Sequence, residues 1–235
     1  MKRIFTIIAL VAISMFAMAQ TNYINNCEPE EPGTSGMENG YAYVDLGLPS
    51  GLKWATCNVG ANSPEEYGDY FAWGEVESKT TYTWSTYKYY KDSKDPYALS
   101  SLTKYCNRSD FGRNGFADTK TVLDPEDDAA HVNWGGSWRM PTEAEQEELR
   151  KNCRWTRDTQ NGVDGYKVIG PNGNSIFLPA AGCKSKGSLE RAGLTGYYWS
   201  SSLETNFPSK AHSVRENDWV SNGRDLGLSV RPVCQ

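Results

Sequence analysis

The chain has few of the residues from which metal centres and nucleic-acid-binding surfaces are built. Only two of its 235 residues are histidines, and its six cysteines include no Cys-x-x-Cys pair, so zinc and thioredoxin-like sites lack a recognisable ligand set. A formal net charge of −5 argues against a nucleic-acid-binding protein, which would need a basic surface to neutralise phosphates. The eight tryptophans nevertheless indicate a folded protein with a sizeable core.

Beyond its N-terminus the chain has no long apolar run. Residues 4–16 are uncharged, follow Lys2 and Arg3, and precede a small-x-small sequence at residues 17–19 that suits signal peptidase. A transmembrane helix needs roughly 20 apolar residues, more than this run contains. Residues 1–19 are therefore predicted to be a signal peptide. This predicts a periplasmic, cell-surface or secreted protein without a transmembrane segment.

The remaining chain divides into a leader and one domain. Residues 20–39 are charged, interrupted by proline and without periodicity, which predicts a flexible leader. Residues 40–235 are predicted to form a single domain, whose first strand is expected at the aromatic and β-branched residues 41–45. All six cysteines follow the signal peptide, and an even number in an exported protein favours disulfides without fixing their pairing.

Asparagine-glycine pairs predict tight turns between short strands, because both residue types tolerate positive φ. One hairpin is expected from residues 166–169 and 175–178, and another from residues 218–221 and 226–233. The five pairs begin at Asn39, Asn114, Asn161, Asn172 and Asn222.

Two helices are predicted among these strands. The first spans residues 125–134, with Asp124 as N-cap, proline at its first position and Gly135 at its end. The second begins at Thr142 with a Thr-x-x-Glu capping box and ends near Cys153. Both are expected to lie on the surface of a sheet.

Residues 79–105 are rich in tyrosine and allow two interpretations. They could form an aromatic binding surface, since tyrosine offers rigid amphipathic contact area. The favoured interpretation is an irregular insertion whose rings pack back onto the domain. The tyrosines concerned are Tyr82, Tyr87, Tyr89, Tyr90, Tyr97 and Tyr105.

Catalytic motifs are also missing. Residues 135–139 lack the closing glycine of a Gly-x-Ser-x-Gly elbow, and residues 182–188 have serine where a P-loop needs lysine. The acidic residues 126–128 suit a helix start, where the helix dipole favours them. The sequence thus indicates no catalytic residue, no metal site and no cofactor.

Several longer phrases carry a family resemblance. Together they resemble the Fibrobacter succinogenes major paralogous domain, a family abundant among exported proteins of Bacteroidetes-type bacteria. The resemblance covers residues 41–234. Its phrases are VDLGLPSGLKWATCNVGA (44–61), YFAWGE (70–75), NWGGSWRMPT (133–142), SIFLPAAG (175–182), GYYWSSS (196–202) and SVRPVC (229–234).

The resemblance implies an α+β domain of the C-type lectin-like fold, with a twisted antiparallel sheet, two helices and long irregular loops. The same family is also distantly similar to the formylglycine-generating, sulfatase-modifying proteins. Relatives usually have tryptophan where this chain has Gln146. In the family phrases, Arg139 and Arg231 are expected to form hydrogen bonds that fix loops. Tryptophans in the phrases are expected in the core, and Trp84, Trp155 and Trp219 nearer the surface.

Two site predictions follow from the lectin-like resemblance. Such folds often tie a helix to the C-terminal strand, which implies a disulfide between Cys153 and Cys234. Their variable recognition surface corresponds to residues 203–226, where Trp219 could stack on a sugar or anchor a protein partner. Alternatively, Trp219 is a core ring and the asparagines form turns, as expected at Asn222. The candidate ligand-binding residues are Asn206, Arg215, Asn217, Asp218, Trp219 and Arg224.

These observations favour an exported, non-enzymatic binding or surface-interaction module that recognises a glycan or a protein. An enzyme related to the sulfatase-modifying group is an alternative, although the cysteine pair that holds copper in the oxidase branch has no counterpart near Cys234. A structural component of a surface assembly is a second alternative.

Overall fold

A computed structural model describes residues 35–91 and 101–235 of the chain. The predicted signal peptide, most of the predicted leader, Cys27 and Tyr97 lie outside these residues. No helix in the described ranges is long and apolar enough to cross a membrane.

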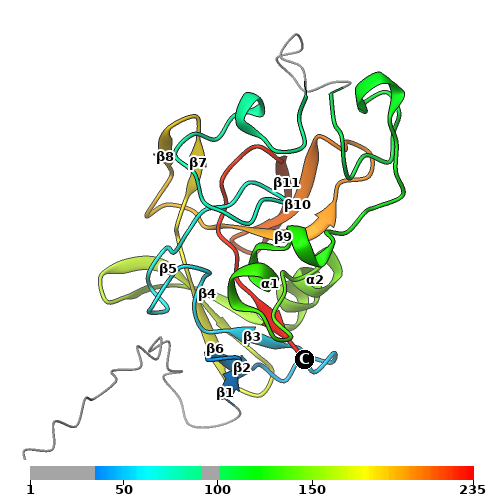
Figure 1. Ribbon diagram of the computed structural model, residues 1–235. Helices are drawn as coiled ribbons and strands as arrows, with labels where there is room; N and C mark the ends of the chain where they lie inside the picture. The colour runs from blue at the N-terminus through cyan, green and yellow to red at the C-terminus, as the bar shows by residue number, and fades with distance from the viewer. Residues whose placement is uncertain (1–34, 92–100) are drawn as a thin grey trace, which may run out of the picture.

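The domain is an α+β structure in which short antiparallel sheets predominate (Figure 1). The described residues contain four sheets and two α-helices, α1 (Ala129–Trp134) and α2 (Glu143–Asn152). The first sheet has the order β1-β2-β3-β12, formed by Ser35–Glu38, Tyr41–Asp45, Lys53–Ala55 and Val233–Cys234. The second has the order β11-β10-β9, formed by Asp218–Gly223, Lys210–Arg215 and Tyr197–Leu203.

The two remaining sheets are smaller hairpin structures. The third has the order β4-β5-β6, formed by Arg154–Gln160, Val163–Ile169 and Ser175–Pro179. The fourth pairs β7 (Cys183–Ser185) with β8 (Ser188–Glu190). Figure 1 shows β1 to β3 at one end of the molecule and the β7–β8 hairpin toward the other end. Three 3-10 helices complete the described elements: η1 (Trp84–Thr86), η2 (Arg113–Gly115) and η3 (Pro125–Asp127).

The domain begins earlier than the sequence predicted. Residues 35–38, assigned to the flexible leader, form β1 and pair with β2 in the register Glu38↔Tyr41. Asn39 and Gly40 supply the turn between them with φ values of 46° and 85°. The first sheet therefore includes one strand from the segment expected to be the leader.

The predicted helix at residues 125–134 is two elements. Pro125 begins η3, but Asp128 has the extended values φ −90° and ψ 112° and becomes the N-cap of α1. The Asp128 carboxylate accepts from the N–H groups of Ala130, His131 and Met140, so it also fixes the segment that leads to α2. The second predicted helix is confirmed, with its capping box at Thr142 and Cys153 as C-cap.

One predicted hairpin is confirmed and the other is wrong. β5 pairs with β6 as expected for residues 166–178. β11 pairs with β10 instead of residues 226–233, in the register Arg215↔Asp218. Glu216 supplies the positive φ of that turn, at 56°, and Asn222 with Gly223 lies within β11. An asparagine-glycine pair permits a turn without requiring one.

Aromatic rings make up much of the core. Trp54, Trp73, Trp134, Trp138 and Trp199 are each at most 5% exposed, as predicted. Tyr82, Tyr87, Tyr89, Tyr90 and Tyr105 are buried in the largest apolar cluster, which confirms the interpretation that these tyrosines pack back onto the domain. Gln146 is buried and donates from Nε2 to the carbonyls of Tyr198 and Trp199.

The predicted disulfide between Cys153 and Cys234 was wrong, because both are free thiols. Cys153 belongs to the apolar cluster that contains Val233, whereas Cys234 belongs to the other large cluster. Successive strand residues point to opposite faces, so Cys234 points away from the cluster of Cys153.

Replacing Asp128 by alanine is expected to lower the free energy of unfolding by about 2–4 kcal/mol, because it removes the α1 cap and the acceptor of Met140 N–H. Chemical denaturation measures this loss. Asp158→Ala, at an exposed strand position, is the control and should change the value by less than about 0.5 kcal/mol. Equal losses in both variants would contradict the capping role.

Candidate functional site

The sequence-predicted ligand residues do not form one surface. Arg215, Asn217, Asp218 and Trp219 lie at the turn of the β10–β11 hairpin. Asn206 and Arg224 lie toward its opposite end, where Lys210 is paired with Gly223. Five residue steps at about 3.3 Å each separate the two ends by roughly 17 Å. A single small ligand therefore cannot contact all six residues.

At the hairpin turn, Trp219 is the main exposed ring. Its side chain is 40% exposed and its ring lies 4.6 Å from that of His212, centroid to centroid. His212 is buried, with Nε2 3.3 Å from the Glu143 carboxylate, and Arg215 pairs with Asp218 at 3.1 Å. These contacts pair the charged groups at the turn, and they leave Trp219 as an exposed aromatic ring.

Arg224 was wrongly predicted to contact a ligand at the surface, because its side chain is completely buried. Its guanidinium donates to the Tyr87 hydroxyl at 2.8 Å and to the carbonyls of Lys104, Tyr105 and Pro208 at 2.9–3.0 Å. The same group lies 4.8 Å from the ring centroid of Trp73. Arg224 is therefore a buried structural anchor.

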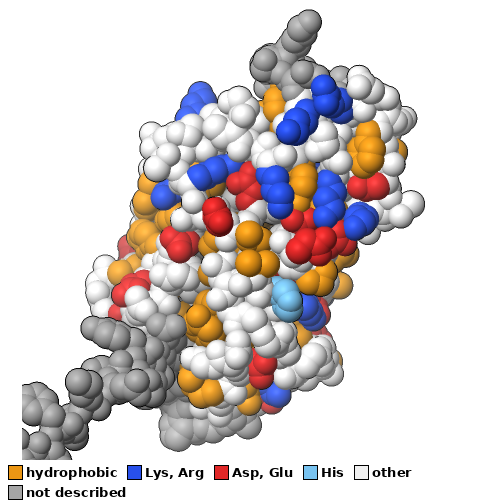
Figure 2. Space-filling view, in the orientation of Figure 1, with side chains coloured by type: hydrophobic (Ala, Val, Ile, Leu, Met, Phe, Trp, Pro, Cys, Tyr) orange, Lys and Arg blue, Asp and Glu red, His pale blue; other side chains and the backbone are white. Residues whose placement is uncertain are grey.

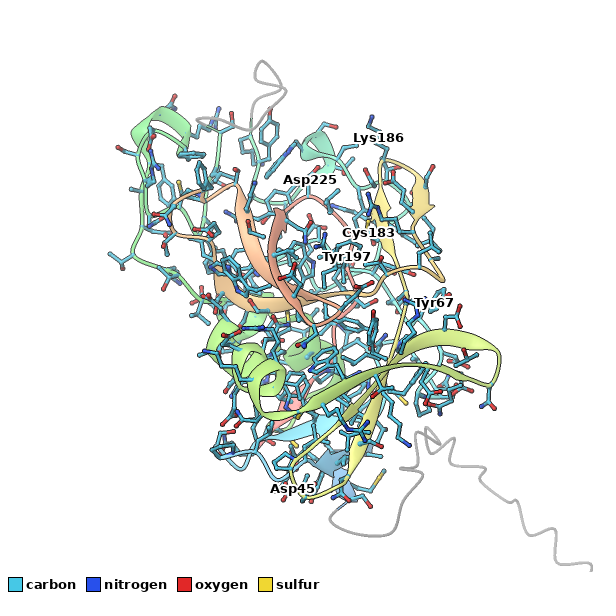
Figure 3. All side chains as sticks on the ribbon, turned by 180° about the vertical axis from the view of Figure 1, so that it is seen from behind. Asp45, Tyr67, Cys183, Lys186, Tyr197 and Asp225 are labelled. Carbon is cyan, nitrogen blue, oxygen red and sulfur yellow. The ribbon has the colours of Figure 1, made fainter. Side chains whose placement is uncertain are left out.

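The next residue, Asp225, lines a cavity of about 320 Å³. The cavity lies between η1 with its flanking residues, the β7 turn and the chain that follows β11. Figure 3 shows Lys186 at the tip of the β7 hairpin and Asp225 closer to the centre of the molecule. Aromatic, hydroxyl and charged groups are combined in its lining: Tyr82, Thr83, Trp84, Ser85, Tyr90, Ser185, Lys186 and Asp225.

Backbone pairing fixes the two sides of this cavity. Tyr82 and Lys186 exchange both backbone hydrogen bonds, at 3.0 Å and 2.8 Å, so η1 is held beside the β7 turn. The Tyr82 hydroxyl donates to the Tyr70 carbonyl, which leaves its ring as a wall. Trp84 and Tyr90 form a second wall, with ring centroids 5.9 Å apart and planes inclined by 49°.

Asp225 is the unusual group of the cavity. It is 9% exposed, and it forms no salt bridge with the cations of residues 35–91 and 101–235. Burial raises the pKa of Asp225 to about 6, and a hydrogen bond from its own backbone N–H and the charge of Lys79 offset this only in part. Burying a carboxylate without a cation costs free energy. Selection for stability alone gives no reason for this arrangement.

Away from this cavity, an acidic cluster is neutralised by a lysine. The ammonium of Lys104 lies 2.7 Å from Asp124, 3.5 Å from Glu126 and 2.6 Å from Asp127. Burial opposes ionisation of Asp127, but Lys104 and Lys88 still hold its pKa below the usual range. A lysine therefore occupies the position in which a metal ion would bind. On the face in Figure 2, acidic and basic side chains are interspersed in the same way.

The free cysteines among the described residues are not activated nucleophiles. Burial raises the pKa of the thiols of Cys106 and Cys183, and raises those of Cys153 and Cys234 to about 11. A reactive cysteine requires the opposite shift, toward the thiolate. Cys106, Cys153 and Cys234 act as small buried apolar groups, and Cys183 is half-buried.

No family model, curated protein or solved structure matches the chain. The cavity is therefore identified as a candidate site from its geometry and charge alone.

Replacing Arg224 by lysine is expected to lower the free energy of unfolding by about 2–4 kcal/mol. A lysine has three donors on one atom and cannot reproduce the four hydrogen bonds of the planar group. Arg154→Lys, at an exposed position, should be close to neutral in the same denaturation experiment. Similar stabilities of the two variants would show that Arg224 does not anchor these loops.

Replacing Asp225 by asparagine is expected to stabilise the protein above pH 7. The folded carboxyl keeps its proton up to about pH 6, whereas the ordinary pKa is 3.8, so wild-type stability falls as the pH rises through this window. The shift corresponds to about 2–3 kcal/mol. Denaturation at pH 4 and pH 7.5 measures the change, and Asp158→Asn should show no such pH-dependent gain. A loss of stability in Asp225→Asn at pH 7.5 would contradict the unpaired state of the carboxylate.

Proposed function

We propose that the protein is an exported, non-enzymatic binding module that takes a polar unit of a glycan or protein ligand into the cavity beside Asp225. The observation that carries this proposal is a buried carboxylate without a cationic partner in the described chain, in a cavity with aromatic walls. Ligand pockets typically combine apolar walls with a few well-placed polar groups. This cavity has that composition.

Polar groups in the lining suit ligand recognition. Thr83, Ser85 and Ser185 place hydroxyl groups around the cavity, and Lys186 adds an exposed ammonium at the tip of its hairpin. Hydroxyl groups both donate and accept hydrogen bonds, so they adapt to a ligand rich in oxygen or nitrogen. The site can therefore bind a polar unit without a metal ion.

The sequence features support the same proposal. The predicted signal peptide favours export, and the family resemblance favours a C-type lectin-like domain, whose loops commonly carry recognition surfaces. The enzymatic alternative gains no support from Cys153 and Cys234, because these two thiols belong to different apolar clusters of the domain. We therefore favour binding over catalysis.

Nuclear magnetic resonance of the tryptophan indole N–H groups tests the location of binding. Mannose, galactose, N-acetylglucosamine, glucuronic acid, glucosamine and choline would each be titrated into the mature protein. A ligand in the cavity is expected to shift the Trp84 signal and leave the Trp219 signal unchanged, because Trp219 lies at the β10–β11 turn. Trp84→Phe and Trp219→Phe assign the two signals.

Trp84→Leu and Trp219→Leu form a matched pair for the affinity measurement. Trp84→Leu should weaken binding of any active probe at least tenfold, and Trp219→Leu should leave it unchanged. If the active probes shift only Trp219 and lose affinity only in Trp219→Leu, the binding surface is the hairpin turn and the cavity proposal is wrong. The proposal also fails if none of the six probes shifts Trp84.

A further inference from the structure

The charge around Asp225 is not balanced by its neighbours. The charge of Lys79 acts on Asp225, but its ammonium lies 2.7 Å from Glu75 and also donates to the Thr86 carbonyl. Lys186 lines the cavity but is exposed, where water and salt screen its charge. The interior of the cavity thus keeps a negative charge.

A metal ion does not suit this site. Calcium takes six to eight oxygen ligands and magnesium requires a near-octahedral set. Asp225 is the only carboxylate among the described residues of the cavity lining, and the described acidic residues that cluster closely enough for a metal are Asp124, Glu126 and Asp127. The single carboxylate therefore suits an organic cation better than a metal ion.

The aromatic walls favour such a cation. Tyrosine and tryptophan rings attract an ammonium group near their faces, and the attraction grows when water is excluded. Tyr82, Trp84 and Tyr90 line the same cavity as the carboxylate, and the inclined planes of Trp84 and Tyr90 form a corner. A neutral sugar gains hydrogen bonds from this lining but leaves the buried charge of Asp225 uncompensated.

We propose that the cavity binds an organic ammonium group of the ligand, which pairs with the Asp225 carboxylate and lies against the rings of Trp84 and Tyr90. This inference rests on the proposed binding function and names the chemical class of the unit that is bound. The ligand could also carry an anionic group close to its own ammonium. The exposed Lys186 at the rim of the cavity would pair with that group.

Isosteric pairs of probes separate charge from shape. Choline and 3,3-dimethylbutan-1-ol have the same outline, but only choline is charged; ethanolamine and ethylene glycol form a smaller pair. At pH 7.5, calorimetry is expected to show at least tenfold tighter binding of one cation over its neutral analogue. Choline or ethanolamine should also shift the Trp84 indole signal.

Asp225→Asn is expected to reduce that charge preference to less than about twofold, while Asp158→Asn keeps it. Because Asp225→Asn is expected to be more stable than the wild type at this pH, loss of preference would not reflect unfolding. Equal binding of cation and neutral analogue overturns the inference, as does a preference that survives in Asp225→Asn.

If a neutral sugar shifts Trp84 and neither cation does, the ammonium inference fails while the proposed binding function stands. If neither the cations nor the sugars shift Trp84, both fail.

Discussion

The arrangement of the loops around the β9–β11 sheet depends on the buried guanidinium of Arg224. Four hydrogen bonds join it to the segment around Tyr87, to residues 104–105 and to Pro208. The Tyr87 hydroxyl that accepts from Arg224 also donates to the Trp73 carbonyl at 2.7 Å. A planar group with five fixed donors can hold several irregular segments at once, which a network of short elements could not do alone. The irregular chain around residues 82–90 is therefore anchored at Tyr87 although η1 is its only described helix.

This anchor also determines the position of the cavity. Asp225 follows Arg224 directly, so the chain that fixes the guanidinium places the carboxylate beside Tyr82 and Trp84. Both interpretations of the tyrosine-rich insertion apply at this cavity. Most of its rings are buried as packing groups, yet Tyr82 and Tyr90 also line the cavity. Packing and recognition use the same aromatic surface.

Local signals in the sequence predicted the local structure, and non-local features were missed. The capping box at Thr142 and the β5–β6 hairpin depend on residues close in sequence, and both are present. The partner of β11 and the separation of Cys153 from Cys234 depend on how distant elements pack. Nothing in the sequence distinguished Asp225 among 29 acidic residues, because its significance comes from burial and from missing partners. Arg224 was selected for its chemistry, but the sequence does not show whether a donor faces solvent or backbone carbonyls.

The other buried charges show why Asp225 is the informative one. Asp127 is only 2% exposed, yet it is bound by Lys88, Lys104 and the Tyr105 hydroxyl. Arg224 is fully buried and donates four hydrogen bonds to carbonyl and hydroxyl acceptors. These two charges thus have partners within the fold, and unpaired groups tend to concentrate where function tolerates the cost. Asp225 is buried as these charges are, but it forms no ion pair with a cation of the described chain. Aromatic rings line the cavity beside it. The missing partner is therefore best sought in the ligand.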